Sequence, residues 1–362
     1  MEKVIKKIYY KIMKRKGYIP YASEALYKDF IEDVKNKKTK FLQKLWCWSK
    51  GFFSDKIEYY GLNKNNYQEY VSDMQYYKLY PINNDFSRWV NDKLTLKYVL
   101  QPYNQYLPEY YYVIKNGKLQ KIFDCPKEYE EDIKSLLVLL TKNKILAVKL
   151  IDGEKGKGFY KLEKKNEKIY VNEEEISEIQ FEDWIKKLNN YIITEYLKGN
   201  KETQKIYKKS LNTIRVMYIR DKSQSYVGNA LIRIGNEKSG VVDNVSQGGY
   251  FSLIDIDTGS YNDAYKFGDG KLEKLKEHPD SKQKIEGDIP FWDEIKEKID
   301  EIGKYLFELE YLGFDIAVTE NGFKIIEINT FQQISFFQVE MPLLKEQTKT
   351  REYFIKKIGE MK

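Results

Sequence analysis

The sequence is almost without histidine and cysteine. His278 is the only histidine in 362 residues, and Cys47 and Cys125 are the only cysteines. A histidine-rich metal site is therefore excluded, and a histidine general base is nearly excluded. The two cysteines have no metal-ligand spacing and imply no disulfide framework, which fits a reducing cytosol. Because His278 lies in the polar segment KEHPDSKQ, we expect it at the surface.

Long apolar runs are also missing. No stretch approaches the length of a membrane span, and no signal-peptide core is recognisable, so we expect a cytoplasmic protein. The 62 basic and 55 acidic side chains give a net charge of +7. That mild excess suits a polyanionic ligand such as a nucleotide, but it is too small to indicate binding of nucleic acid. The composition predicts no particular oligomeric state.

The first residues combine apolar and basic side chains. In EKVIKKIYYKIMKRKGY the apolar residues recur at helical spacing, which predicts a basic amphipathic helix. The apolar set is Ile5, Ile8, Tyr9 and Ile12, and the lysines around it are Lys3, Lys6, Lys7, Lys11 and Lys14. Two interpretations stay open: the helix packs on the protein with a solvated basic face, or that face meets the inner membrane surface or a glycolipid.

The rest of the chain mixes helical and strand patterns. We divide it into a mainly helical region 1–85, an α+β unit 86–197 and a second α+β unit 198–362. Helices are predicted within 91–100 (with Asn91 as N-cap), 131–144, 175–190 and 290–313, and strands at 145–151, 191–197, 211–220 and 226–236. Helices beside antiparallel strands, in at least two layers, indicate an α+β fold.

The most informative segment is GFDIAVTENGFKIIEIN, residues 313–329, which predicts a β-hairpin. A strand Phe314–Val318 is followed by a turn at Asn321-Gly322 and a strand Phe323–Ile328. A three-residue loop of residues 320–322, with Gly322 in the left-handed conformation, places Asp315 opposite Glu327.

Three oxygen-bearing side chains then share one face of this hairpin. Glu327 and Asn329 are two residues apart and point to the same side of their strand, and Asp315 joins them across the pair. Two carboxylates and an amide, with room for water and phosphate oxygens, suit Mg²⁺. The alternative is an edge hairpin whose polar residues face water.

A lysine and a glycine-rich loop lie close together earlier in the chain. Lys149 is the one charged residue in the apolar strand 145–151, so we expect it to have an anionic partner. The loop KGKG, residues 155–158, can point backbone N–H groups at phosphate oxygens through Gly156 and Gly158, with Lys157 between them. It is not a Walker A sequence, and the alternative is a basic hairpin tip.

Two further sets of polar residues lie on strands. Glu195 ends the buried strand 191–197, where it can accept from an adenine amino group; the alternative is a carboxylate in water. Arg215 and Arg233 lie on neighbouring β-runs, which also hold Asn212. Arginines there suit bidentate capture of a carboxylate or phosphate, or bridge acidic residues across the sheet.

The order of these motifs resembles the ATP-grasp superfamily. More narrowly, NTIRV, LIRIG, DN-x-S-x-GG and DIAVTENGFKIIEIN look like the sugar-transfer-associated ATP-grasp proteins found with surface polysaccharide biosynthesis. The resemblance covers about residues 91–345 and implies an ATP-grasp fold, in which two α+β subdomains, 86–197 and 198–362, clamp ATP. It leaves the helical region 1–85 unassigned.

The resemblance also implies roles for residues at matching positions. Phosphates of ATP would meet Lys93, Lys149 and the loop residues Gly156, Lys157 and Gly158. The hinge residues Glu195, Tyr196 and Leu197 would bind adenine, and Asp315, Glu327 and Asn329 would hold Mg²⁺, with two ions expected. Arg215 and Arg233, with Lys149, would stabilise the transferred phosphoryl group. Glu202 has the spacing of an acidic ribose ligand, although its segment KGNKETQK matches the family poorly.

Three functions follow from this resemblance. The first is an amide-forming ligase, which activates a carboxylate as an acyl-phosphate and needs no histidine base, since a carboxylate is already ionised at neutral pH. Its substrate would be a small molecule or a glycan precursor. The second is a sugar kinase, for which Asp243 or Asp255 could be the base. The third is a nucleotide-binding module without turnover.

Overall fold

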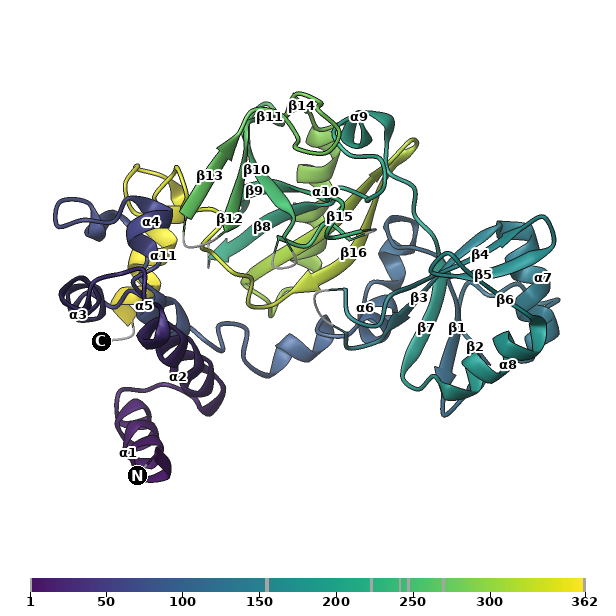
Figure 1. Ribbon diagram of the computed structural model, residues 1–362, viewed down its shortest axis with the longest axis horizontal. Coiled ribbons are helices and arrows are strands. Elements are labelled where there is room, and N and C mark those ends of the chain that lie inside the picture. The colour runs from purple at the N-terminus through teal and green to yellow at the C-terminus, as the bar shows by residue number, and fades with distance from the viewer. Residues whose placement is uncertain are drawn as a thin grey trace.

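The computed structural model describes residues 2–153, 156–221, 224–240, 242–245, 248–268 and 271–360, with side chains from Lys6 onward. Three parts follow one another along the longest axis (Figure 1). Helices from the N-terminal region lie at one end, a nine-stranded sheet lies in the middle, and a seven-stranded sheet lies at the other end. Helices and antiparallel sheets in this arrangement form an α+β fold, as the sequence predicted.

The seven-stranded sheet is antiparallel throughout and has the order β2-β1-β7-β3-β4-β5-β6. Its strands are β1 (Tyr110–Lys115), β2 (Lys118–Lys121), β3 (Ile145–Leu150), β4 (Tyr160–Lys165), β5 (Lys168–Val171), β6 (Glu174–Ile176) and β7 (Tyr191–Glu195). Helices α7 (Ile133–Asn143) and α8 (Glu178–Lys187) bury Leu136, Leu140 and Phe181 against it. This unit carries the predicted phosphate-binding segments.

The larger sheet has the order β13-β12-β10-β9-β8-β15-β16, with β11 beside β10 and β14 beside β11. Its strands are β8 (Ile214–Asp221), β9 (Gln224–Ile234), β10 (Tyr250–Ile254), β11 (Ser260–Asn262), β12 (Ala264–Gly268), β13 (Lys271–Leu275), β14 (Glu286–Asp288), β15 (Tyr311–Thr319) and β16 (Gly322–Asn329). Helix α10 (Trp292–Tyr305) packs Ile295, Ile299 and Ile302 onto one face, in the core that also holds Val216 and Tyr218.

The opposite face of this sheet is covered by both ends of the chain. Met217 and Ile219 alternate with the α10-facing residues of β8 and join a second core. That core includes Tyr60 and Val71 from the N-terminal region, and Phe354 from α11 (Lys349–Glu360). The helices here are α1 (Glu2–Arg15), α2 (Pro20–Lys35), α3 (Phe41–Ser49), α4 (Lys56–Tyr60), α5 (Asp73–Lys78) and the short 3₁₀ turns η1 (Tyr67–Glu69) and η2 (Asn84–Trp89). The predicted helical character of region 1–85 is therefore confirmed.

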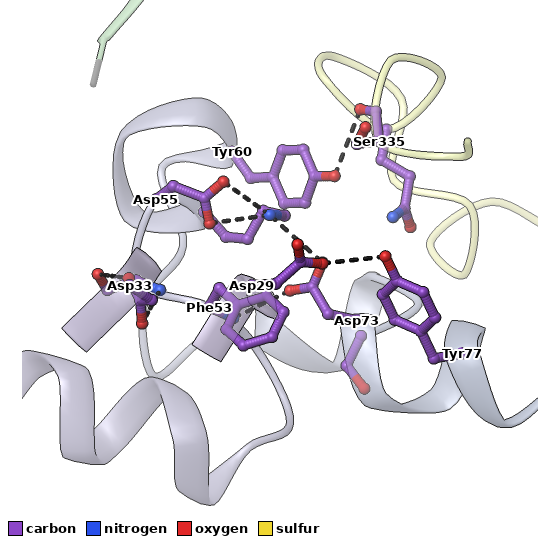
Figure 2. A network of polar contacts seen from close by, with 12 residues as sticks. Asp29, Asp33, Phe53, Asp55, Tyr60, Asp73, Tyr77 and Ser335 are labelled. Atoms are coloured by element: carbon purple, nitrogen blue, oxygen red, sulfur yellow. Dashed lines mark hydrogen bonds and ion pairs between the residues drawn. The ribbon is translucent and has the colours of Figure 1, made fainter. Parts of the chain in front are cut away.

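A buried polar network fastens the N-terminal helices together (Figure 2). The Lys56 ammonium lies 2.8 Å from Asp55 Oδ1 and 3.3 Å from Asp73 Oδ1. Burial alone would lower the pKa of Lys56, but Asp73 and Asp55 outweigh it and hold that pKa well above the ordinary value. Tyr60 Oη donates to the backbone oxygen of Ser335 at 3.3 Å, which connects this network to the C-terminal segment. The network's polar groups satisfy one another, so it holds structure.

The segment before the seven-stranded sheet packs with the other subdomain. Helix α6 (Lys93–Val99) and the 3₁₀ segment η3 (Gln101–Tyr106) precede β1. Leu96, Leu100 and Leu107 nevertheless belong to the core under α10. The predicted boundary at residue 86 stays a prediction, but the chain reaches the seven-stranded sheet only at Tyr110. Helix α9 (Lys201–Gln204) follows the return crossing.

Two predicted helix ends were wrong. Helix α6 is capped by Asp92, whose carboxylate accepts from Thr95 N at 2.7 Å, while Asn91 Oδ1 accepts from Thr330 Oγ1 at 2.8 Å. Helix α10 ends at Tyr305 and not at residue 313 as predicted, because β15 already begins at Tyr311.

His278 is fully buried instead of exposed. Its ring stacks on Tyr207 at 5.0 Å, and Nε2 lies 2.8 Å from the backbone oxygen of Gly235. The polar residues around it in the sequence did not reveal that the loop folds back onto the sheet. No helix within the described ranges is long and apolar enough to cross a membrane.

Candidate active site

The predicted hairpin is present and pairs Asp315 with Glu327. The turn differs from the prediction: Thr319 pairs with Gly322, so the loop has two residues, not three. The register shifts between Asp315 and Ile316, which leaves Ile326 as the extra residue of a β-bulge. This bulge restores the pairing of Asp315 with Glu327 that the shorter turn alone would have broken. The predicted set of residues on one face was therefore correct, but the predicted loop geometry was wrong.

Asp315 is buried between two arginines. Arg215 lies opposite it on β8, and Nη2 of Arg215 donates to Asp315 Oδ2 at 2.9 Å while Nε contacts Oδ1. Arg233 Nη2 lies 3.1 Å from Asp315 Oδ2. Burial would raise the pKa of Asp315, but the two guanidinium groups outweigh burial and hold it below the ordinary value. A metal ion would therefore share Asp315 with two fixed positive charges.

Arg233 is itself held in place by Thr213 and Asp243. Thr213 Oγ1 accepts from Arg233 Nη2 at 2.6 Å and from Nε at 2.9 Å. Asp243 Oδ1 lies 3.8 Å from Arg233 Nε, and Asp243 Oδ2 accepts from the backbone N–H of Thr213. The sequence analysis missed Thr213. Its position two residues before Arg215, on the same side of the chain, was the available signal.

Asn329 completes the polar face of the hairpin. With its amide oxygen turned toward Arg215, it accepts from Nη2 at 3.3 Å, and its nitrogen donates to Glu327 Oε1 at 3.2 Å. Asn329 therefore orients both the arginine and the second carboxylate. Asp315, Glu327 and Asn329 lie together as predicted.

Asn212 does not join this face. It is fully buried before β8, where its amide donates to the backbone oxygens of Thr203 and Tyr207, both at 2.8 Å. Its role is structural.

Two lysines lie near the hairpin, one at the start of α6 and one on the seven-stranded sheet. Lys93, the first residue of α6, has its Nζ 3.5 Å from Glu327 Oε2, and it donates to the backbone oxygen of Gly153 at 2.9 Å. Lys149 lies on β3, as predicted. Burial, and next the charge of Lys93, lower the pKa of Lys149 to about 8, against the opposing charges of Glu195 and Glu327. These effects place Lys149 and Glu327 in one electrostatic environment.

The expected anionic partner of Lys149 is not found. In the part of the chain that the structure describes, no carboxylate lies within ion-pair distance of its ammonium. Its charge is thus incompletely compensated beside Lys93. A buried ammonium of this kind is stabilised when an anion arrives.

The glycine loop joins β3 to β4 beside Lys149. Gly156 and Gly158 have φ of +73° and +68°, which favours glycine. A Cβ on Gly156 would lie 2.8 Å from Val242 Cγ1 of the larger sheet's subdomain, and one on Gly158 would lie 2.7 Å from Leu150 Cδ1. Lys157 between them is exposed, and Lys155 lies outside the described residues. The loop therefore approaches the other subdomain closely enough to exclude a side chain.

The predicted adenine-binding residues lie where the chain leaves the seven-stranded sheet. Glu195 ends β7, its N–H donates to the backbone oxygen of Glu109 at 2.9 Å, and Glu109 N–H donates to Glu195 Oε1 at 3.0 Å. Burial raises the pKa of Glu195. Tyr196 and Leu197 follow, both partly buried, with Lys161 Nζ 5.8 Å from the Tyr196 ring.

Glu202 has no contact with the other predicted site residues among the contacts of the described residues. It lies on α9, its side chain is 53% exposed, and it forms an ion pair with Lys205. Its predicted role at the ribose stays a prediction.

The donor set suits a metal ion that brings its own oxygens. No group of three or more histidine, cysteine, aspartate or glutamate side chains within the described ranges is placed to hold a metal alone. Asp315, Glu327 and Asn329 offer two carboxylates and an amide, which suits Mg²⁺ completed by phosphate and water. Lysines and glycine N–H groups on the facing side suit the phosphates. The residues present therefore fit Mg²⁺ with ATP.

Several solved structures are similar to this chain at low identity. A structure of the ATP-grasp ligase PsnB with minimal precursor, Mg and ADP has a TM-score of 0.41 and 14% identity, over 77% of this chain and 61% of that one. D-alanyl-alanine synthetase A from Vibrio cholerae O1 biovar eltor has a TM-score of 0.43 and 12% identity, over 76% of this chain and 66% of that one. N5-carboxyaminoimidazole synthase from Aspergillus clavatus has a TM-score of 0.38 and 9% identity, over 74% and 54%. The chain spans less than two thirds of each of these proteins.

A comparison with curated proteins found no match. The family described as sugar-transfer associated ATP-grasp matches residues 72–352, which is most of the chain and includes every predicted site residue. The protein therefore belongs to the sugar-transfer associated ATP-grasp family.

Proposed function

We propose that this protein is an ATP- and Mg²⁺-dependent ligase that joins a carboxylate to an amine. The observation that carries the proposal is the convergence of Lys149, Lys93 and Glu327. Two ammonium groups from one side and a carboxylate from the hairpin meet at one place. Such a place has the charges to hold a magnesium–triphosphate.

Each group of residues would contact a different part of the bound magnesium–ATP. Asp315, Glu327 and Asn329 would hold Mg²⁺, which neutralises phosphate charge when it is bound. Lys93, Lys149 and the glycine loop hold the phosphate chain, and Lys157 on that loop can close over it. The segment from Glu195 to Leu197 faces the base. Arg215 and Arg233, fixed by Asp315 and Thr213, present guanidinium groups to the transferred phosphoryl group.

The proposed reaction has two steps. A substrate carboxylate oxygen attacks the γ-phosphorus of ATP, the bond from that phosphorus to the ADP oxygen breaks, and an acyl-phosphate and ADP result. An amine nitrogen then attacks the carbonyl carbon, inorganic phosphate leaves with the bonding electrons, and the amine releases a proton to water. Catalysis by positioning and fixed charge is consistent with a protein whose single histidine is buried against Gly235.

The carboxylates that a kinase would use as a base are already engaged. Asp243 accepts from Thr213 N–H and faces Arg233. Asp255 Oδ1 accepts from Thr258 N at 2.8 Å and from Thr258 Oγ1 at 2.9 Å in an exposed turn. These contacts favour the ligase over the sugar kinase.

The substrate class rests on the family. Membership in the sugar-transfer associated ATP-grasp family supports a sugar or glycan precursor as the acceptor. We propose that the reaction takes place in the cytoplasm, in surface polysaccharide biosynthesis. The arrangement of the charged side chains supports only the nucleotide-binding part of this proposal.

Hydroxylamine tests the reaction type. Purified protein is incubated with ATP, Mg²⁺, hydroxylamine and a set of carboxylic acids, amino acids and sugars. A ligase forms a hydroxamate together with ADP, whereas a kinase forms a phosphorylated sugar. Release of ADP with every substrate, and no hydroxamate with any of them, would contradict the proposal. A thermal-shift screen of nucleotide sugars and amino acids with ATP and Mg²⁺ selects the substrates, because a ligand that binds the native state raises its melting temperature.

A further inference from the structure

The excess of basic over acidic residues is confined to the first fifty residues of the protein. This segment has fourteen lysines and arginines against five acidic residues. The remaining 312 residues have 48 basic and 50 acidic side chains, which is close to neutral. The net charge of +7 is therefore produced by helices α1 to α3 and their connections. This is a separate feature from the nucleotide site, whose residues all follow position 90.

Helix α1 has two apolar edges, and only one is packed. Tyr9 and Met13 pack with Ala22 and Leu26 of α2, and Tyr9 Oη donates to the backbone oxygen of Ser23 at 3.2 Å. This contact fixes which way the helix faces.

The second edge of α1 points away from the protein. Ile8 and Ile12 lie one turn apart on it, and they are 55% and 47% exposed. Lys7, Lys11 and Arg15 are exposed along one side of this edge. The helix thus presents an isoleucine strip flanked by cations. A water-facing helix in a stable fold gains nothing from such a strip.

Helix α3 repeats the combination. Phe41 and Leu42, in its first turn, are 67% and 78% exposed, and Leu45 on the same side is 43% exposed. The basic segment KNKKTK, residues 35–40, comes directly before them. Lys44 of the same helix is instead buried and donates to the backbone oxygen of Val34 at 3.1 Å, which caps α2. The apolar residues are therefore exposed although the helix itself is firmly attached.

We propose that helices α1 and α3 form a docking surface for an anionic lipid bilayer. Bilayers with acidic headgroups attract clustered lysines and accept apolar side chains just below the headgroups, which is the pair of features found here. Long lysine side chains can extend to the phosphates while the isoleucines insert. An acidic partner without apolar side chains would satisfy the charges but leave Ile8, Ile12 and Leu42 without an apolar partner. The bilayer satisfies both at once.

The position of the surface suits this role. Helices α1 to α3 lie at one end of the molecule, and the seven-stranded sheet lies at the opposite end (Figure 1). Docking by this end leaves that sheet free in solution. The inference does not depend on the proposed function, because it uses no residue of the nucleotide site.

Vesicle flotation with the full-length protein tests the proposal. One set of vesicles is phosphatidylcholine alone, and the other is phosphatidylcholine with phosphatidylglycerol. We expect the protein to float with the anionic vesicles at low salt. Raising the salt concentration should lower the bound fraction at least about tenfold. Absence of flotation with anionic vesicles, or equal binding to neutral ones, would overturn the proposal.

Two double variants separate the apolar and the ionic contributions. Ile8→Ser with Ile12→Ser, and Lys7→Glu with Lys11→Glu, should each lower the bound fraction at least about tenfold. Wild-type binding by both variants would overturn the proposal.

The matched controls lie at the far end of the molecule. Val138→Ser with Ile179→Ser removes side chains that are 55% and 75% exposed, and Lys118→Glu with Lys127→Glu reverses two exposed lysines. Both controls should bind as wild type does. Circular dichroism confirms the fold of each variant. Light scattering tests the alternative of self-association. If the wild-type protein is a dimer that does not bind vesicles, and Ile8→Ser with Ile12→Ser makes it monomeric, this face is a dimer interface and the bilayer proposal is refuted.

Discussion

Lys93 and Glu327 join the two halves of the proposed nucleotide site, with Nζ and Oε2 3.5 Å apart. The same ammonium donates to the backbone oxygen of Gly153, just after β3. One lysine thus contacts the hairpin of Asp315 and Glu327 and the segment just after the strand that carries Lys149. Because Lys93 is buried and begins a capped helix, this contact is held by the fold. The predictions below depend on this convergence.

Replacing Glu327 with Gln should abolish Mg²⁺-dependent turnover and change stability little. The side chain is 30% exposed, so loss of its ion pair with Lys93 costs about 1 kcal/mol or less. Steady-state ADP release and urea denaturation measure the two effects. Glu320→Gln in the turn of the same hairpin is the control: its carboxylate oxygen accepts from Lys201 N, which glutamine also can do. Normal turnover by Glu327→Gln would remove this residue from the site.

ATP binding should take up protons near pH 8. The pKa of Lys149 is lowered to about 8 in the free protein, so about half of these side chains are neutral at that pH. Phosphate favours the charged form and raises this pKa, so about half a proton enters with each ATP. Calorimetry in buffers of different ionisation enthalpy measures it. Lys149→Met should abolish the uptake, while Lys134→Met on α7 should not.

The same shift has a consequence for stability without ATP. Because the pKa of Lys149 in the folded state lies below its ordinary value of 10.5, the unfolded chain binds more protons between the two. The contribution of Lys149 therefore opposes folding below pH 8 and is relieved as pH rises toward 10.5. Urea midpoints across this range should rise less in Lys149→Met than in wild type. An unchanged slope would show that Lys149 is fully charged in the free protein.

Alanine at Gly158 should weaken ATP binding by about tenfold or more. Its φ of +68° disfavours a side chain, and the new Cβ would lie 2.7 Å from Leu150 Cδ1. The loop would have to move away from the phosphates. Gly61→Ala is the matched control, since Gly61 has φ of +58° but no atom within 4 Å of an added Cβ. It should lower stability slightly and leave the KM for ATP unchanged.

Asp315→Asn should destabilise the ATP-free protein by about 3 kcal/mol, far more than Glu327→Gln does. The substitution leaves Arg215 and Arg233 facing each other without their shared carboxylate. Urea denaturation measures the loss. Asp293→Asn is the control, because its side chain is 93% exposed and its ion pair with Lys296 contributes little.

A double variant checks the cause of that loss. Arg215→Gln combined with Asp315→Asn should cost less than the sum of the single substitutions, since the two side chains contact each other. Strict additivity would show that the destabilisation arises elsewhere.

The sequence predicted the residues of the hairpin face better than its backbone. Period-two alternation placed Glu327 and Asn329 together, and the turn residues placed the hairpin. The bulge at Ile326 could not be predicted, because a bulge is chosen by how both strands fit their neighbours. Side-chain identities carried the chemical information, and tertiary packing decided the register.

Burial was the property that the sequence predicted least well. His278 is surrounded by polar residues in the chain, yet its ring lies between Tyr207 and Tyr250, which are distant in sequence. Lys149 could be predicted on a strand. That its ammonium has a neighbouring lysine, and no carboxylate at ion-pair distance among the residues that the structure describes, could not be predicted. Such facts depend on contacts between subdomains, which local patterns do not contain.

The pairing of Glu109 with Glu195 limits how the two sheets can move. The chain enters the seven-stranded sheet just before β1 and leaves it just after β7, and these strands are neighbours. Two reciprocal hydrogen bonds, of 2.9 Å and 3.0 Å, connect the entry and the exit. The two chain connections to this sheet, before β1 and after β7, therefore lie at the same point. Any rotation of the seven-stranded sheet against the larger sheet would therefore turn about this point and carry Lys149 and Gly158 with it.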